Sequence, residues 1–234
     1  MNDEAPPCVR LYTYRRCPYA MRARMALLVA GIPFDAFEIV LRAKPAGLLA
    51  ASPKATVPVL VLPGGEVIDQ SWDIVRWAFT ARRDDPAVWA WWSRADTTDN
   101  QQLLNLNDHG FKAMLDRYKY PERFGLTTHD DAHTARLFHR QQAVTDFLVP
   151  LDARLQATPY LGGDRPCATD IGTFPFVRQF AAVDPIWFEA LPLPGVQGWL
   201  KGWLDSPLFQ HCMLKLAPDT VQRFAALAAE HRQP

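Results

Sequence analysis

The 234-residue sequence lacks several features that would assign it to a specialised class of protein. Lysine and arginine total 25, as do aspartate and glutamate, so no charge excess predicts binding to nucleic acid or to an anionic membrane. No apolar run approaches the roughly 18 residues that a membrane-spanning helix needs. The opening Met-Asn-Asp-Glu-Ala-Pro-Pro carries acidic groups and no apolar core, so we do not expect a signal peptide.

Cysteine is also scarce. Its four positions, Cys8, Cys17, Cys167 and Cys212, have scattered spacings that fit neither a disulfide framework nor a zinc site. We therefore expect no metal and a reducing, cytoplasmic environment. The remaining composition, 49% hydrophobic and 21% charged, is typical of a soluble globular protein with one large or two small domains.

The first part of the chain alternates between strand and helix patterns. Strands are expected at 9–14, 34–41, 57–62 and 66–69, and helices at 18–30, near 45–51 and from Ser71, which is placed to cap the last one. The predicted order is βαβαββα. Gly64-Gly65 is expected to form a two-residue turn that makes the last two strands an antiparallel hairpin.

The sequence pattern changes after residue 84, and no later stretch has a strand pattern. Helices are expected within 87–118, 129–157, 169–183, 195–204 and 218–231. The sequence thus predicts an α/β domain over 1–83 and an all-α domain over 84–234.

Cys17 is the residue most suggestive of chemistry. It follows a predicted strand, and Pro18 suits the first position of a helix, where its missing N–H is no loss. Free N–H groups and the positive end of the helix dipole favour a thiolate at this junction. Arg15 and Arg16 add positive charge just before it. A lone cysteine is more often an inert apolar side chain, which is the interpretation given to the other three.

Three further segments have both a plain and a functional interpretation. Pro58, in Thr-Val-Pro-Val-Leu, is either an ordinary trans proline entering a strand or a cis proline that leaves the backbone of Val57 open to an added peptide strand. Gln70 and Ser71 open a helix. There the serine side chain either caps the helix or the free N–H groups bind a carboxylate. Lys44 is either a solvated surface lysine or an anion ligand.

Together these residues resemble a known family. Cys-Pro-Tyr-Ala at the first helix, Thr-Val-Pro-Val-Leu, and the Gln70-Ser71 pair are similar to the glutathione-binding domain of glutathione transferases, most closely the cysteine-type members of the omega and glutaredoxin-like classes. The resemblance covers the first domain. It implies a thioredoxin-like α/β domain followed by an all-helical domain.

The resemblance also implies roles for individual residues, with glutathione as co-substrate. Cys17 would form a mixed disulfide with glutathione, flanked by Tyr19. The backbone of Val57, before Pro58, would pair with the cysteinyl part of the tripeptide. Gln70 and Ser71 would hold the γ-glutamyl end, and Lys44 the glycine carboxylate. Gln70 stands where the family often has glutamate, so weaker glutathione binding is expected.

Ala20 occupies the position at which dithiol oxidoreductases place a resolving cysteine. Cys17 would therefore act alone, with a second glutathione as the resolving thiol, in a glutathione-dependent thiol transferase or reductase. Two alternatives remain open: a transferase that conjugates glutathione to small electrophiles, and a non-catalytic binding protein that uses the same fold as a scaffold. Relatives include both two-fold dimers and monomers, so a homodimer is one expectation among two.

The second domain offers two further predictions. Tyr118, Tyr120 and Arg123 mix aromatic faces with positive charge and form a candidate wall for a small or glutathionylated second substrate, although a helix end with a polar rim is the plainer interpretation. Cys167 and Asp170 resemble a Ser/Thr-x-x-Asp capping box whose hydroxyl residue is replaced by cysteine, so half of the reciprocal box is expected to be missing.

Overall fold

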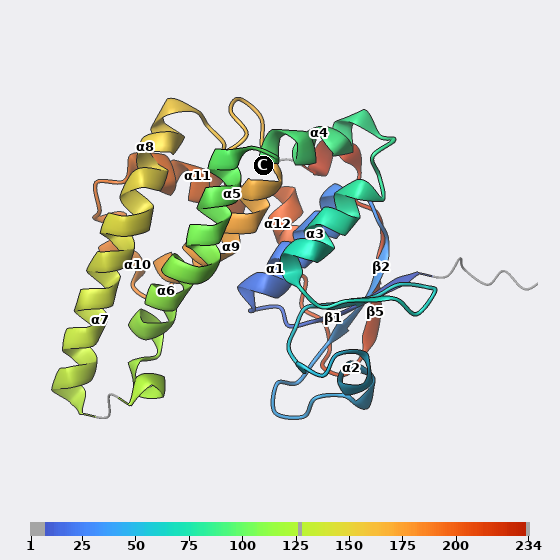
Figure 1. Cartoon of the computed structure of the whole chain (residues 1–234), viewed down its shortest axis with the longest axis horizontal. Helices are drawn as coiled ribbons and strands as arrows, with labels where there is room; N and C mark the ends of the chain where they lie inside the picture. The colour runs from blue at the N-terminus through green and yellow to red at the C-terminus, as the bar shows by residue number, and fades with distance from the viewer. Residues whose placement is uncertain (1–7, 126–127, 233–234) are drawn as a thin grey trace, which may run out of the picture. The chain divides into compact units, whose positions relative to one another are not determined.

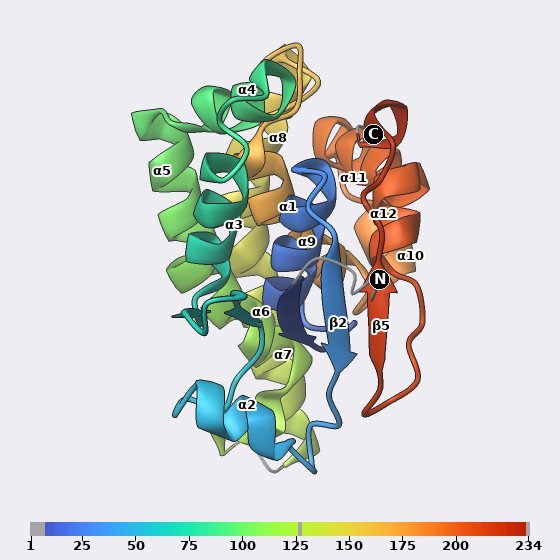
Figure 2. The same ribbon diagram turned by 90° about the vertical axis from the view of Figure 1, so that its right-hand side faces the viewer.

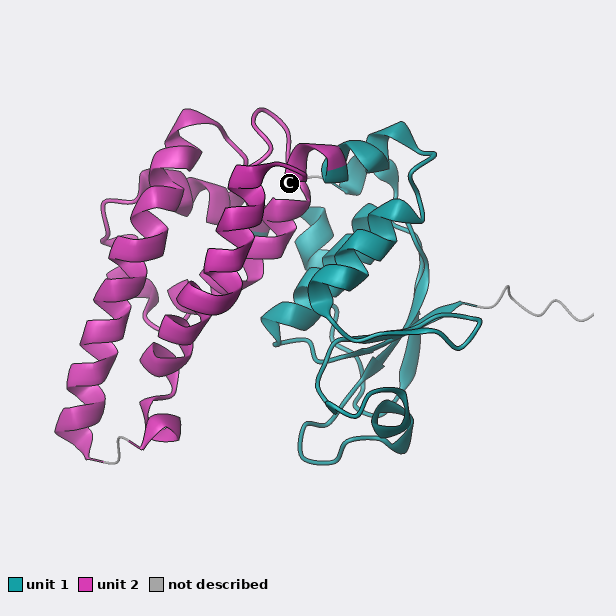
Figure 3. Ribbon diagram, in the orientation of Figure 1, with its two compact units in different colours: residues 1–92, 204–234 teal, residues 93–203 magenta. Residues whose placement is uncertain are grey.

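The structure is a computed structural model that describes residues 8–125 and 128–232. It divides into two compact units (Figure 3). Unit 1 comprises Met1–Trp92 with Leu204–Pro234, and unit 2 comprises Ser93–Trp203. The predicted ranges, 1–83 and 84–234, differ from these units in two places: most of the helix after residue 84 and the C-terminal segment both group with the sheet.

Unit 1 is a five-stranded mixed sheet with helices. Its elements are β1 (Val9–Thr13), α1 (Pro18–Val29), β2 (Phe34–Glu38), α2 (Ala46–Ala51), β3 (Val59–Val61), β4 (Val67–Ile68), α3 (Ser71–Thr80), most of α4 (Pro86–Ala95), α12 (Pro207–Cys212), β5 (Val221–Phe224) and the 3-10 turn Ala229–His231. The strand order is β4-β3-β1-β2-β5. Strands β1 and β2 are parallel and the other pairs antiparallel. The predicted βαβαββα order and thioredoxin-like architecture are confirmed.

Helix α1 is the central helix of this unit and lies beside α3 (Figure 1). It begins at Pro18, as predicted, and almost every residue in it is buried. Gly31 then ends the helical path with φ of 63°, where a side chain would be strained. A Cβ atom at Gly31 would also lie 2.5 Å from Nη2 of Arg232, so glycine leaves room for that guanidinium.

The β3–β4 hairpin is antiparallel, as predicted, but its loop is longer than expected. The Leu62 N–H donates to the Glu66 carbonyl at 2.8 Å, which leaves three residues, Pro63, Gly64 and Gly65, in the loop. Gly65 has φ of 88°, the left-handed conformation that a three-residue hairpin loop requires.

The C-terminal segment corrects a second prediction. A helix was expected over 218–231, but Val221–Phe224 forms β5, which pairs with the edge of the sheet along β2 (Figure 2). Phe224 stacks on Phe34 with ring centroids 4.8 Å apart, and the Arg223 guanidinium binds both oxygens of Asp35 at 2.6 and 3.2 Å. The open N–H and C=O groups of β2 and these two contacts outweigh the local helix propensity of the alanine-rich tail.

Unit 2 is helical. Its elements are α5 (Thr98–Asn105), the π-helical segment η1 (Leu106–Phe111), α6 (Lys112–Lys119), the 3-10 turn η2 (Pro121–Phe124), α7 (His129–Ala143), the π-helical segment η3 (Val144–Leu148), α8 (Val149–Ala157), α9 (Ala168–Ala181), α10 (Pro185–Glu189) and α11 (Pro194–Asp205), which runs into unit 1. The stretches 87–118 and 129–157 are therefore interrupted helices. Phe111 on η1 stacks on Phe147 of η3, with centroids 4.3 Å apart.

Helix α9 begins with the capping box in which Cys167 replaces a hydroxyl residue. The prediction that half the box is missing is wrong, because both halves are present: the Cys167 thiol accepts the Asp170 N–H, and the Asp170 carboxylate accepts the Cys167 N–H at 2.8 Å. Asp170 also accepts from the Leu161 N–H at 3.0 Å and from Trp199 Nε1 at 2.8 Å. Sulfur is a weak acceptor, and the Asp170 N–H also lies 3.1 Å from the Cys167 carbonyl oxygen, so the thiol shares this N–H with the backbone.

Within the described ranges, every helix is too short or too polar to span a bilayer.

Candidate active site

Cys17 occupies the N-cap position of α1. Its backbone is extended (φ −79°, ψ 123°), Pro18 takes the first helical position, and no acidic residue stands in the first turn of the helix. The side chain is partly exposed. The predicted strand–cysteine–helix junction is thus present, with the thiol at the positive end of the α1 dipole.

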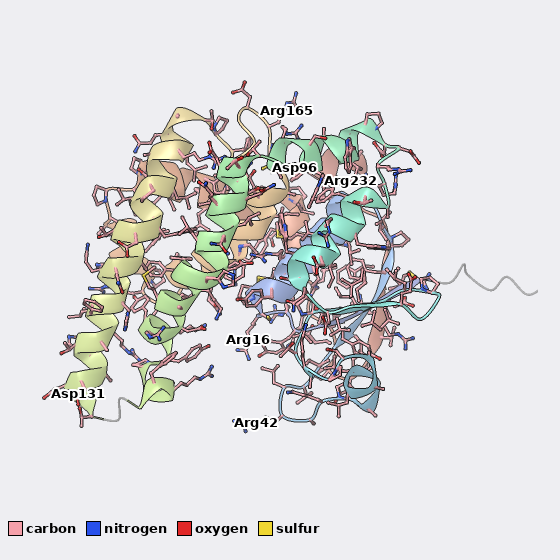
Figure 4. The ribbon with its side chains drawn as sticks, viewed as in Figure 1. Arg16, Arg42, Asp96, Asp131, Arg165 and Arg232 are labelled. Atoms are coloured by element: carbon pink, nitrogen blue, oxygen red, sulfur yellow. The ribbon has the colours of Figure 1, made fainter. Side chains whose placement is uncertain are left out.

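A tight turn carries Cys17 from β1 into α1. The Cys17 N–H donates to the Tyr14 carbonyl at 2.9 Å, which closes the four-residue turn 14–17. Both arginines of the turn are engaged elsewhere: Arg16 Nε donates to the Tyr14 hydroxyl at 2.9 Å, and Arg15 Nη1 lies 3.5 Å from the Met213 carbonyl. The side chain of Arg16 projects from this turn in Figure 4. Their positive charge stays near the turn, fixed by these contacts.

Val57 lies next to the thiol. The Cys17 Sγ is 3.8 Å from the Val57 carbonyl oxygen, a distance at which a thiol donates a weak hydrogen bond. The peptide bond between Val57 and Pro58 is cis. Pro58 is buried and Val57 partly exposed, and β3 begins only at Val59. The structure therefore brings together two of the predicted site residues that are far apart in sequence.

Ser71 and Tyr19 both contact Arg22, a residue that the sequence analysis did not select. This side chain is fully buried on α1, and its Nη1 donates to the Ser71 hydroxyl at 3.2 Å. Its guanidinium lies 5.7 Å from the ring centroids of both Tyr19 and Trp72. Arg22 links the N-terminal part of α1 to the start of α3. Two arginines, at 22 and 24, inside an otherwise apolar helix were the signal that could have revealed it.

Ser71 was predicted to cap α3, but the observed N-cap is Gln70, one residue earlier. Ser71 is the first residue of the helix. Gln70 is exposed. The preceding residue, Asp69, accepts from the Ser52 hydroxyl and from Lys54 Nζ, each at 2.8 Å. These two hydrogen bonds lower the pKa of Asp69, with Lys54 the larger cause. Asp69 therefore ties the end of α2 to the start of α3.

Lys44 lies in the loop before α2 and is exposed. Its role toward a carboxylate stays a prediction.

The predicted wall of unit 2 divides into a core residue and surface residues. Tyr118 is only 4% exposed, and its ring packs 5.2 Å from that of Phe180. Burial raises the pKa of Tyr118 despite a hydrogen bond with Arg140. Its ring therefore faces the core of the unit, which speaks against the predicted substrate contact. Tyr120 is partly exposed, with the exposed Arg123 guanidinium stacked 3.9 Å from its ring centroid, and the substrate contact of these two residues stays a prediction.

The other cysteines are placed differently from Cys17. Cys167 and Cys212 are buried, and Cys8 is partly exposed with its thiol donating to the Pro33 carbonyl at 3.0 Å. Burial raises the pKa of Cys8. In the part of the chain that the structure describes, no group of three or more histidine, cysteine or acidic side chains could hold a metal ion.

Comparison with known proteins supports this architecture. Residues 16–80 match the family model for the glutathione S-transferase N-terminal domain. Among curated proteins, pyrimidodiazepine synthase of Drosophila melanogaster is 38% identical over 66 residues, which are 27% of each protein. A probable glutathione transferase of Aplysia californica is 38% identical over 55 residues, 24% of this chain and 60% of that one. The matched regions are thus about a quarter and three-fifths of these relatives.

Among solved structures, a glutathione transferase family member from Pseudomonas fluorescens with two glutathione bound superposes with a TM-score of 0.73 at 18% identity, covering 91% of this chain and 95% of that one. Residues 16–80 are therefore similar to the N-terminal domain of glutathione S-transferases, and the chain as a whole has the glutathione transferase fold.

Proposed function

We propose that the protein is a glutathione-dependent thiol transferase whose nucleophile is Cys17. The observation that carries the proposal is the position of this thiol, at the N-terminus of α1 and 3.8 Å from the Val57 carbonyl. The site suits a peptide-like thiol: the backbone of Val57, which lies just before β3, can pair with it, and the N-terminus of α3 can receive a carboxylate. The P. fluorescens relative holds two glutathione molecules.

The proposed reaction has two balanced steps. The Cys17 thiolate attacks the glutathionyl sulfur of a mixed disulfide, forming Cys17–S–SG and releasing the substrate thiolate. A second glutathione thiolate then attacks that same glutathionyl sulfur, which releases Cys17 as thiolate and forms oxidised glutathione. Ala20 cannot supply a resolving thiol, so the second glutathione is required.

Thiol chemistry indicates which step gains most from the helix N-terminus. Lowering a thiol pKa from about 8.5 to about 6.5 raises its thiolate fraction at pH 7 roughly 25-fold. Its intrinsic nucleophilicity falls roughly 6- to 10-fold over the same shift, so attack gains only about 3-fold. The same shift makes the cysteine a better leaving group in the second step. Alignment of glutathione at Val57, Gln70 and Ser71 must supply the remaining acceleration.

The test is formation and removal of a glutathione adduct. Wild-type protein incubated with oxidised glutathione should gain one glutathionyl group on Cys17, measured by mass spectrometry of peptides, and reduced glutathione should remove it. Cys17→Ser should abolish both the adduct and turnover of a glutathionylated peptide. Cys8→Ser is the matched control, since Cys8 is also partly exposed but is held protonated by burial, and it should leave both unchanged.

The result also separates the alternatives. No adduct on Cys17, with conjugation of a chlorodinitrobenzene-type electrophile surviving in Cys17→Ser, would replace the proposal by a conjugating transferase. Absence of both activities would leave a binding protein on the same scaffold.

A further inference from the structure

The turn that carries Cys17 is fastened from a neighbouring strand. Within the turn, the Cys17 N–H donates a hydrogen bond to the Tyr14 carbonyl. The Arg15 N–H donates to Glu38 Oε1 at 2.7 Å. A hydrogen bond to an ionised acceptor is about twice as strong as a neutral one. Glu38 is therefore in direct contact with the backbone two residues before the thiol.

Glu38 is itself held in place by a buried charge. It is the last residue of β2 and only 8% exposed. Its second oxygen, Oε2, lies 3.8 Å from Nη1 of Arg24, which is fully buried on α1. Among the described residues Oε2 has no hydrogen-bond partner, so the Arg15 N–H holds one oxygen of the carboxylate and the charge of Arg24 faces the other.

The C-terminal segment completes the arrangement. Arg24 Nη2 lies 3.4 Å from the Leu214 carbonyl, and its guanidinium stacks 5.0 Å from the ring centroid of Phe224 on β5. The Asp219 N–H donates to the backbone carbonyl of Glu38 at 2.9 Å. The segment that forms β5 therefore encloses both members of the Arg24–Glu38 pair, beside the turn that leads to Cys17.

We propose that Glu38 is a positioning residue for Cys17: its carboxylate fixes the 14–17 turn, and thereby the sulfur, at the N-terminus of α1. The importance of this role for turnover rests on the proposed function, but its effect on the thiol does not. When the acceptor is lost, the turn loses its backbone hydrogen bond to the neighbouring strand, and the sulfur samples positions away from the helix N-terminus, where its thiolate is less stabilised.

The experiment compares Glu38→Gln with Glu38→Met in a Cys8→Ser background. The two replacement side chains are similar in length and both remove the charge that faces Arg24, but only the glutamine amide oxygen can accept the Arg15 N–H. The rate of Cys17 alkylation by iodoacetamide is measured against pH. We expect Glu38→Met to slow alkylation at pH 7 about 3-fold and to move the midpoint of the pH profile upward, whereas Glu38→Gln stays within about 2-fold of the parent.

Asp35→Asn is the matched control, because Asp35 lies on the same strand and binds Arg223 of the same C-terminal strand without touching the turn. It should leave the rate unchanged. If Glu38→Met does not fold, the double variant Arg24→Met/Glu38→Met is used in its place. It removes both buried charges, and the same slowing of alkylation is expected. Equal alkylation rates in the glutamine and methionine variants would overturn the proposal. Because iodoacetamide needs no glutathione, this outcome is separate from failure of the glutathione adduct on Cys17.

Discussion

Cys17 and Cys167 hold the same position in two different helices and have opposite surroundings. Each is the N-cap residue, of α1 and α9 respectively. Cys17 is partly exposed, is followed by Pro18, and has no acidic residue in its first turn. Cys167 is fully buried and shares its capping box with Asp170.

The electrostatic consequence differs accordingly. Burial, and then the charge of Asp170, raise the pKa of Cys167, so this thiol stays protonated and serves as a small acceptor for the helix. A helix N-terminus favours a thiolate only where water reaches the sulfur and no carboxylate competes for the free N–H groups. Position at a helix start is therefore insufficient to identify a reactive cysteine.

The largest expected effect is the difference in reactivity between these two thiols. In native protein, alkylation of Cys167 requires opening of unit 2, whereas Cys17 reacts directly. With an ordinary stability of at least about 5 kcal/mol, opening slows labelling of Cys167 by about 10³-fold or more. Mass spectrometry of peptides over a time course of iodoacetamide labelling measures both rates. Labelling rates of Cys17 and Cys167 within tenfold of each other in native protein would contradict the expected difference in reactivity.

The next effect comes from removing the acid that distinguishes the two caps. Asp170→Ala leaves the Cys167 N–H, the Leu161 N–H and the Trp199 indole N–H without their buried acceptor. At about 1–3 kcal/mol for each unsatisfied group, the free energy of unfolding should fall by at least about 3 kcal/mol. Urea denaturation measures the loss, and labelling of Cys167 should accelerate in parallel.

Asp184→Ala is the control for that change. Asp184 caps α10 through the Trp187 N–H at 3.2 Å, but its side chain is 44% exposed. Its loss should cost only about 1 kcal/mol. A loss at Asp170 no larger than that at Asp184 would mean that burial of the box adds nothing.

The smallest effect is a pH dependence assigned to Cys167. Because burial raises its pKa in the folded protein, the unfolded thiol, with a pKa of about 8.5, loses its proton first as pH rises. The stabilisation is complete below about pH 8.5 and declines above it, by at most about 1.4 kcal/mol per pH unit. Cys167→Ser should therefore show a shallower decline in unfolding free energy between pH 8.5 and 10. Identical slopes in the two proteins would assign the decline to other groups.

The sequence predicted those parts of the site whose signals are local. Cys17-Pro18 marked the start of α1, and the strand and helix patterns around Val57 and Ser71 gave the order of elements. The role of Arg22 was not predicted, because a guanidinium inside an apolar helix reveals that it needs a partner but does not identify the partner. The π-helical segments η1 and η3 have no recognisable local pattern, and the stacking of Phe111 on Phe147 joins residues far apart in sequence.

By itself, the sequence predicted the candidate nucleophile and determined where helices and strands alternate in the first domain, because turn residues, caps and periodicity act over a few positions. Only the tertiary structure decided that the chain beyond residue 217 adds a strand to β2, and that Glu38 faces the turn before Cys17. Leu214 lies 190 residues beyond the Arg24 guanidinium that it contacts. Such contacts depend on hydrogen bonds and charges that meet only after folding, and no local propensity encodes them.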